Sequence, residues 1–179
     1  MAWKKTVTLK DGRKILLRNL SPKDSVRELR SFISSFVKEG AFLLRDEVPS
    51  MKEEREWFKC SLRKIRESQA IDLVAESKGR IVGKADARKG DYKQCDNVTI
   101  GIAILPGFRG AGLGRILLTE LIARVKHDFK PNNIVLSVFA PNKRAHALYK
   151  KVGFREFARF PNWLKHRGKY YDQIYLILR

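Results

Sequence analysis

The segment ILPGFRGAGLGRILL, residues 104–118, places four glycines and two arginines between two apolar runs. Glycine weakens both strands and helices, so this density indicates that something must approach the bare backbone. The apolar run before the glycines is typical of a buried strand, and the run after them is typical of a helix. The first amides of a helix have no partners within it and carry the positive end of its dipole. The sequence therefore predicts a phosphate or pyrophosphate site at residues 109–115.

Two common phosphate motifs do not fit this glycine segment. A P-loop needs a Gly-Lys-Ser or Gly-Lys-Thr triplet, which residues 104–118 lack. The dinucleotide fingerprint G-x-G-x-x-G needs a spacing different from that of the glycines at positions 110, 112 and 114. The segment is therefore another kind of phosphate-binding turn, or its glycines only allow a helix to pack tightly against a strand.

Outward from this segment, the sequence divides into strand and helix patterns. Residues 98–105 are almost entirely apolar and predict a central strand, and residues 132–140 predict another buried strand. The helix between them, from Gly112 to about Lys126, makes a strand–helix–strand unit. The other expected elements are two strands in 6–19, helices beginning at Ser21-Pro22 and Pro49-Ser50, a hairpin of 71–77 and 80–90, a short helix from Pro141-Asn142 to Gly153, and a terminal hairpin of 154–166 and 169–178. The order β-β-α-α-β-β-β-α-β-α-β-β predicts a mixed α/β sheet.

Length and composition favour a single compact domain. The chain has 179 residues, which suits a single domain over 1–179, and an apolar fraction of 44% is enough for a core. No apolar run approaches the roughly 20 residues of a membrane span, and the first residues do not resemble a secretory signal. We therefore expect a cytoplasmic protein without membrane association. Two cysteines and three histidines offer no metal-ligand spacing, so no metal is expected.

The charge balance is unusually basic. Lysine and arginine total 38 against 19 aspartates and glutamates, a formal net charge of +19. Such a field favours a phosphate-rich cofactor, RNA, a ribosomal surface or an acidic protein as partner, and it disfavours polyamine substrates. The alternative is a lysine-rich surface that is simply solvated, as in heat-adapted proteins.

Two separated motifs resemble those of one known family. The pattern Arg109-x-x-Gly112-x-Gly114 lies where a strand turns into a helix, and a second segment, NKRAHALYKKVGF, follows at residues 142–154. Both are similar to landmarks of the GNAT superfamily, the acetyl-CoA-dependent N-acetyltransferases. The resemblance covers about 98–179, and before that only the order of elements fits. It implies a GNAT acyltransferase fold, acetyl-CoA as donor and no metal. The terminal segments are most similar to the branch that acetylates protein N-termini, including those of ribosomal proteins.

The resemblance also implies which residues contact acetyl-CoA. In the family, the loop amides bind the pyrophosphate and the preceding strand pairs its backbone with the pantetheine arm. Carried over, the loop residues are Arg109, Gly110, Ala111, Gly112, Leu113, Gly114 and Arg115, and the strand residues are Ile102, Ala103 and Ile104. Asn142 is a further candidate, although Asn before a helix is also a natural N-cap. Arg144 could meet a phosphate or be solvated.

The resemblance assigns the catalytic acid to Tyr149, which would protonate the leaving thiolate; the alternative is a buried core tyrosine. A phenol with a pKa near 10 holds its proton at neutral pH. The family's base positions, in contrast, hold Thr99 and Ser137, and neither side chain is a useful base. Asp96, Glu47 and Asp172 are substitute carboxylates that could equally be surface residues.

These observations leave two functional hypotheses. The favoured one is an N-acetyltransferase that moves acetyl to a primary amine, most plausibly a protein or peptide N-terminus, by direct attack in a ternary complex. Without a strong base, an α-amine is an easier acceptor than a lysine. The alternative, which the net charge and the missing base motivate, is a basic RNA- or ribosome-associated module with vestigial or regulatory CoA binding. The aromatic residues on either side of the basic run 165–169 could stack on RNA bases or form the hairpin core and the wall of a substrate groove. The resemblance also suggests a homodimer formed through the terminal hairpin.

Overall fold

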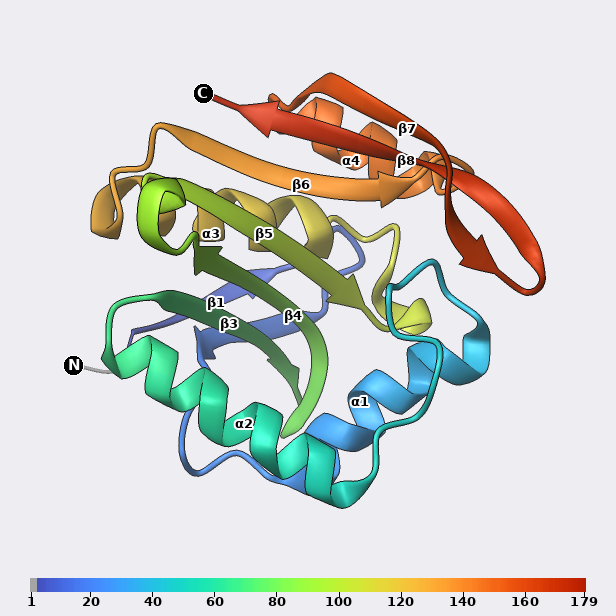
Figure 1. Ribbon diagram of the computed structural model, residues 1–179. Coiled ribbons are helices and arrows are strands. Elements are labelled where there is room, and N and C mark those ends of the chain that lie inside the picture. Colours follow the sequence, from blue (N-terminus) through green and yellow to red (C-terminus); the bar gives the residue numbers. More distant parts are fainter. Residues whose placement is uncertain (1–2) are drawn as a thin grey trace.

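The computed structural model describes residues 3–179, which build one eight-stranded mixed sheet flanked by helices (Figure 1). The strand order is β1-β2-β3-β4-β5-β6-β8-β7, and only the β5–β6 pair is parallel. The strands are β1 (Lys4–Thr8), β2 (Lys14–Asn19), β3 (Ala70–Ser77), β4 (Arg80–Lys89), β5 (Asn97–Ile104), β6 (Asn133–Phe139), β7 (Arg155–His166) and β8 (Lys169–Leu178). The helices are α1 (Val26–Glu39), α2 (Met51–Arg66), α3 (Leu113–Asp128) and α4 (Lys143–Lys151), with 3₁₀ turns at Tyr92–Gln94 and Pro106–Phe108. The predicted mixed sheet and order of elements are confirmed.

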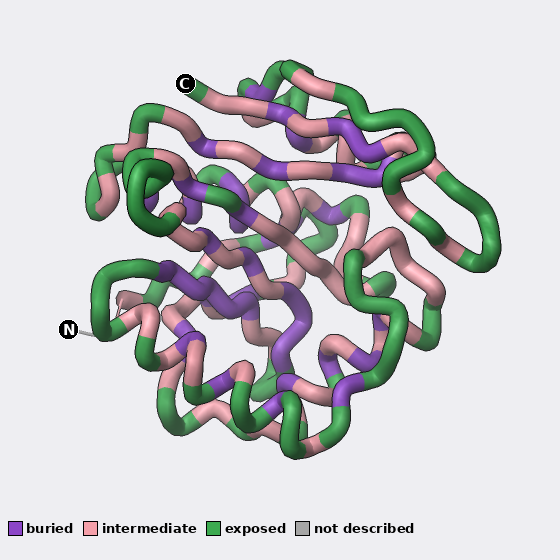
Figure 2. The backbone as a smooth tube through the Cα atoms, in the orientation of Figure 1, coloured by how far each residue is buried: buried purple, intermediate pink, exposed green. Residues whose placement is uncertain are grey.

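Helices cover both faces of the sheet. The larger buried cluster lies between the sheet and α3, with Leu113, Leu117 and Leu121 fully buried against β2 to β6. A smaller cluster lies under α1 and α2, where Phe32, Phe36 and Phe58 pack on the opposite face. Figure 2 shows buried stretches along the inner strands, while the helices alternate between buried and exposed residues. The almost wholly apolar strand β5 is central, as its composition predicted.

The two halves of the sheet separate between β5 and β6. The two strands pair only over Asn97–Thr99 and Asn133–Val135, and beyond that they diverge (Figure 1). On one side β5 stays paired with β4 as far as Ile104, and on the other β6 stays paired with β8 as far as Phe139. One edge of each diverging strand is therefore left without a sheet partner, and backbone groups on such an edge can accept an extended ligand.

The helix starts follow capping chemistry, with one correction. Helix α2 begins after Ser50, which forms a capping box with Glu53, as the sequence predicted. Helix α1 was expected from Ser21-Pro22 but begins at Val26, capped by Ser25. The reason is a turn at residues 21–24, in which the Ser21 amide donates to Asp24 at 2.8 Å. Arg18 holds the same aspartate at 2.7 Å, so the chain cannot turn into a helix until after it.

Candidate active site

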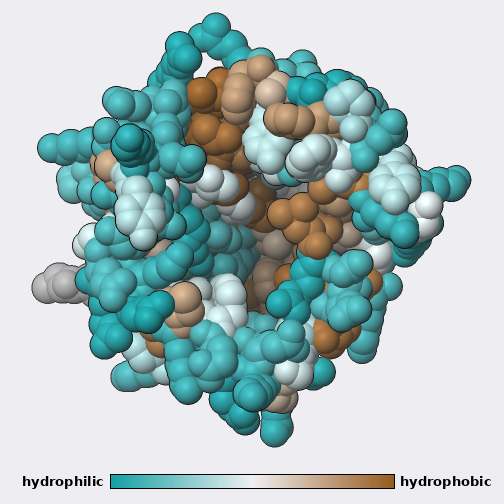
Figure 3. Space-filling model, in the orientation of Figure 1, coloured by the Kyte–Doolittle hydropathy of each residue, from teal (hydrophilic) through white to brown (hydrophobic). Residues whose placement is uncertain are grey.

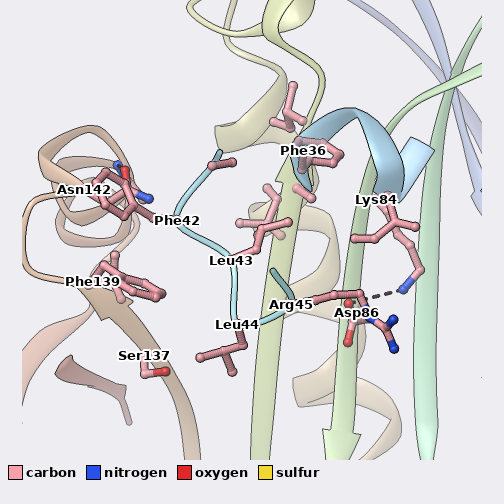
Figure 4. Close-up of a pocket in the computed structure, with 18 of the residues that line it drawn as sticks. Phe36, Phe42, Leu43, Leu44, Arg45, Lys84, Asp86, Ser137, Phe139 and Asn142 are labelled. Atoms are coloured by element: carbon pink, nitrogen blue, oxygen red, sulfur yellow. Dashed lines mark hydrogen bonds and ion pairs between the residues drawn. The ribbon is translucent and has the colours of Figure 1, made fainter. Parts of the chain in front are cut away.

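A cleft of about 710 Å³ occupies the gap between the diverging strands. It is lined by β4, β5, β6 and α4, and by α1, α2 and the loop between these two helices. Figure 3 shows the molecule hollowed on this face, with hydrophobic residues gathered in the hollow. The α1–α2 loop crosses the cleft, where the Phe42 ring lies 5.4 Å from that of Phe139 and 5.0 Å from that of His166 (Figure 4). The loop between α1 and α2 therefore reaches over the cleft and contacts β6 and β7.

The glycine segment forms the turn that leads from β5 into α3. Gly110 and Gly112 have φ values of 86° and 95°, in the left-handed region, and Gly112 is the N-cap of α3. Gly114 serves packing instead, because a Cβ there would come within 2.9 Å of Leu148 Cδ2 and 3.2 Å of Ile104 Cδ1. The packing alternative is therefore confirmed for Gly114, while phosphate binding by this turn stays a prediction. The turn places the first amides of a 16-residue helix beside the cleft, an arrangement that suits a pyrophosphate.

The two arginines of this segment have different surroundings. Arg109 lines the cleft, where its Nε donates to the carbonyl of Ile104 at 2.8 Å. Its guanidinium also forms an ion pair with Glu39 at the end of α1, with one of the two hydrogen bonds at 2.7 Å. Arg115 is exposed on α3 and does not line the cleft. Arg109 is therefore engaged within the chain, whereas Arg115 remains available to solvent or to a ligand outside the cleft.

The second predicted segment packs directly beside the first, with Leu148 near Gly114 and Arg144 near Gly110. Asn142 is the N-cap of α4, since its Oδ1 accepts from the Ala145 amide at 3.2 Å, and it also lines the cleft. Arg144 is exposed at the cleft rim, 3.4 Å from a Cβ placed on Gly110. Tyr149 is 7% exposed, and its hydroxyl makes no hydrogen bond to any residue in 3–179. Burial raises the pKa of Tyr149 to about 12, so the phenol is protonated at neutral pH.

The strand β5 completes this group. Ile102, Ala103 and Ile104 line the cleft on the stretch of β5 that has left β6. The structure thus brings the predicted strand residues, Arg109, Asn142, Arg144 and Tyr149 to one cleft, with the glycine turn at its end. A model of the acetyltransferase (GNAT) family matches residues 35–154 of the chain. The chain belongs to the GNAT family.

Among the similar proteins, some have names that give an acceptor, and these acceptors are of two kinds. An N-alpha-acetyltransferase from Sulfurisphaera tokodaii is 31% identical over 101 residues, which are 51% of this chain and 60% of that protein. A ribosomal-protein-alanine N-acetyltransferase structure from Brucella melitensis superposes with a TM-score of 0.80 at 20% identity, covering 90% of this chain and 98% of that one. A phosphinothricin acetyltransferase from Sinorhizobium meliloti, solved with acetyl-CoA, gives 0.78 at 21%, covering 90% and 86%. The described domain is therefore an acetyl-CoA-dependent GNAT N-acetyltransferase, and both protein N-termini and small molecules occur among its relatives' acceptors.

The two positions that the resemblance matches to the family's base hold hydroxyls beside the cleft, and the substitute carboxylates lie elsewhere. Thr99 and Ser137 do line the cleft, and Ser137 Oγ accepts from Gln173 at 2.8 Å. None of Asp96, Glu47 and Asp172 lines it. Asp172 instead pairs with Arg159 at 3.0 Å, at the outer hairpin. These three carboxylates therefore lie outside the cleft, and none of them is placed to act as a base there.

Four carboxylates line the cleft, Glu39, Glu53, Glu54 and Asp86, and sequence reasoning singled out none of them. Glu39 pairs with Arg109 and Glu53 belongs to the capping box of α2, which leaves Glu54 on α2 and Asp86 on β4. A signal for Glu54 was present, because it precedes Trp57 and Phe58 by three and four residues and so lies on the apolar face of its helix. Asp86 lies two residues from both Lys84 and Arg88 on β4, so the three side chains face the same side of the sheet. A charge on a face that should be apolar points to a site or to a buried ion pair.

A buried ion network supports this part of the sheet. Asp72 of β3 is fully buried and pairs with Lys84 at 2.7 Å and with Arg88 at 2.8 Å. The two cations hold the pKa of Asp72 below its usual range although burial alone would raise it. Asp86 joins from the cleft side, 3.3 Å from Lys84 Nζ. Within residues 3–179, no three His, Cys, Asp or Glu side chains are arranged to hold a metal ion, and no helix is long and apolar enough to cross a membrane.

Proposed function

We propose that this protein transfers the acetyl group of acetyl-CoA to the α-amine of a peptide or protein N-terminus, by direct attack in a ternary complex. The observation that carries the proposal is a cleft in which Tyr149 is buried at one side while hydroxyls, Thr99 and Ser137, stand where a glutamate base was expected. An α-amine, with a pKa of about 7.7–8.0, is partly neutral at pH 7, whereas a lysine amine near 10.4 is almost wholly protonated. A site with hydroxyls at those positions favours the amine that is easier to deprotonate.

The chain's own groups are suited to hold the donor. Acetyl-CoA supplies an activated thioester when bound. The amides after Gly110 and Gly112 at the start of α3 would bind its pyrophosphate, with Arg144 at the rim and Arg115 further out. The free edge of β5 at Ile102–Ile104 would pair with the pantetheine arm. Asn142 faces the same space while capping α4.

Tyr149 is placed to act as the acid. Its phenol lines the cleft, has no hydrogen-bond partner in residues 3–179 and stays protonated far above neutral pH. A thiol with a pKa of about 8.5 is a stronger acid than this phenol, so full proton transfer to the thiolate is uphill. Tyr149 would therefore act first by donating a hydrogen bond to the sulfur as negative charge develops there, and solvent would replace any proton that it passes on. Neither Cys60 nor Cys95 lines the cleft, which supports direct attack by the amine rather than an acetyl-cysteine step.

A second candidate rests on the exposed face of the terminal hairpin. Trp163 and Tyr170 are 62% and 60% exposed, and Lys165 Nζ lies 5.9 Å from the centre of the Tyr170 ring. Aromatic and basic residues in this arrangement can stack on unpaired bases, and the net charge of +19 adds attraction. This candidate predicts RNA binding whose affinity falls steeply with salt, together with no turnover of acetyl-CoA. The cytoplasmic location and the homodimer remain predictions from the sequence.

The experiment is calorimetry of acetyl-CoA with CoA-free protein, beside the variant Gly112→Glu. A glutamate adds a side chain at a left-handed position and a negative charge at the helix start, so it should abolish binding. Turnover is then followed as CoA thiol release with a panel of peptides that differ in the first residue, beside phosphinothricin. Binding by the parent alone and turnover with peptides support the proposal. Folded parent protein that binds no acetyl-CoA, or that acetylates only phosphinothricin, contradicts it.

A further inference from the structure

The cleft contains a carboxylate that the proposed function does not use. Glu54 is only 6% exposed, yet it lines the cleft, and its side chain forms no hydrogen bond or ion pair with any residue in 3–179. Neither of its carboxylate oxygens is fully enclosed, so the group reaches the space of the cleft. A ligand in the cleft could therefore donate to it without displacing a partner from the chain.

The same helix face directs Glu54 toward β4. Trp57 follows Glu54 by three residues, so the two side chains share one face of α2. The Trp57 ring lies over Lys84 of β4, with Nζ 4.7 Å from the ring centre. Lys84 Nζ is in turn 3.3 Å from Asp86 Oδ1, an interaction drawn in Figure 4. Glu54 on α2 and Asp86 on β4 therefore both line the cleft and both lie near Lys84.

Asp86 also reaches over the strand that carries the predicted donor contacts. A Cβ placed on Gly101 of β5 would lie 3.5 Å from Asp86 Oδ1 and 4.0 Å from Oδ2. Gly101 immediately precedes Ile102, the first residue of the strand segment expected beside the pantetheine arm. The missing side chain at Gly101 therefore leaves room for the carboxylate next to the place where a thioester would lie.

The surrounding charges leave Glu54 free to act. Lys84 and Arg88 are both offset by Asp72, at 2.7 and 2.8 Å. Two more arginines face Glu54 without bonding to it. Arg30 donates to the carbonyl of Pro49 at 2.6 Å, and Arg45 lies 4.0 Å from Glu53. Burial raises the pKa of the Glu54 carboxyl above its usual value, while Arg45, Lys84 and Arg30 oppose this rise. A carboxylate with a raised pKa is a better proton acceptor than an exposed one.

We propose that the acceptor's amino group binds between the carboxylates of Glu54 and Asp86, and that Glu54 takes its proton during transfer. The inference rests on acetyl transfer to an amine, but not on the amine being an N-terminus. The amine nitrogen forms a bond to the acetyl carbon while the bond from that carbon to sulfur breaks. One proton passes from nitrogen to Glu54, and one passes from Tyr149 to the thiolate. Glu54 later loses its proton to solvent, from which the tyrosinate regains one.

The test compares Glu54→Gln with Glu56→Gln, an exposed glutamate on the same helix that pairs only with Lys59. With the best acceptor from the peptide and phosphinothricin panel, Glu54→Gln should lower kcat about 100-fold or more and leave acetyl-CoA affinity unchanged. It should also remove the fall of kcat on the acid side of the pH profile, which a structural role would not move. Asp86→Asn should raise KM for the amine, and Glu56→Gln should match the parent. A loss below twofold in Glu54→Gln, or an unchanged acid limb, overturns the proposal.

A second readout needs no turnover. The carboxyl ¹³C signal of Glu54 should shift when alaninamide is added to protein saturated with CoA, and that of Glu56 should not. No shift at saturating amine contradicts the assignment of Glu54. If phosphinothricin is the only acceptor, the N-terminal proposal fails while the Glu54 comparison is still decided on that amine.

Discussion

Arg109 and Glu39 form an ion pair that joins the glycine turn to the C-terminal end of α1. The same guanidinium holds the carbonyl of Ile104, where β5 ends. One side chain thus fixes three elements around the cleft mouth. Both partners remain partly exposed, at 24% and 33% of their side chains, so the pair itself should contribute little to global stability.

A double-mutant cycle on this pair separates its two roles. Arg109→Ala and Glu39→Ala should show a coupling of about 0.5–1 kcal/mol in the free energy of unfolding by urea. Arg109→Ala should weaken acetyl-CoA binding more than Glu39→Ala does, because only the arginine also orders Ile104. Equal losses of affinity in the two single variants would show that Arg109 acts only through the ion pair.

The glycines of the turn should respond differently to alanine. Gly114→Ala brings a methyl within 2.9 Å of Leu148 Cδ2, so it should destabilise the fold by about 1–3 kcal/mol. Gly112→Ala meets no atom closer than 3.7 Å and should cost about 1–2 kcal/mol through its φ of 95° alone. Thermal unfolding measures both. Restoration of stability by Leu148→Ala in the Gly114 variant only would confirm the distinction, and rescue of both or neither would contradict it.

Tyr149→Phe tests the acid. Because the hydroxyl makes no hydrogen bond within residues 3–179, its removal should change stability and acetyl-CoA affinity little. The kcat for acetyl transfer should fall about 100-fold or more if the phenol protonates the thiolate. Steady-state kinetics beside calorimetry measures both quantities. An unchanged kcat would show that Tyr149 is not the acid and serves only as a core residue.

The network around Asp72 sets the response to acid. Asp72→Asn leaves Lys84 and Arg88 without their buried partner and should cost about 3–5 kcal/mol of stability. The folded pKa of Asp72 is lowered, so its contribution is full above the ordinary value of 3.8 and is lost as pH falls through the folded value. Urea titrations from neutral pH down to pH 3 should show a steeper decline in the parent than in the variant. Parallel declines would remove Asp72 as the cause.

Much of the fold could be predicted from the sequence because its signals are local. The apolar run of β5, the glycine turn and the Ser50 cap each act through neighbouring residues. The start of α1 could not, because it depends on Arg18, from another element, holding Asp24. Asn142 has one predictable role and one unpredictable role. Its capping of α4 is local, whereas its place in the cleft depends on how far β5 and β6 diverge.

The acceptor side was the least predictable part of the site. Glu54 and Asp86 come from α2 and β4, and the sequence marks each only as a charge on a face that should be apolar, without showing that both line one cleft. Tertiary contacts bring them to the cleft, among them that of Trp57 on α2 with Lys84 on β4. Asp96, Glu47 and Asp172 lie outside the cleft. Carboxylates that meet through tertiary packing need the structure to be found.

The most direct test of the account uses one peptide that carries both a free α-amine and an internal lysine. The protein, acetyl-CoA and this peptide are incubated at pH 7, and fragmentation mass spectrometry locates the acetyl group. The account predicts acetylation at the N-terminal nitrogen, with the lysine unmodified. Acetylation of the lysine with the N-terminus free would contradict it.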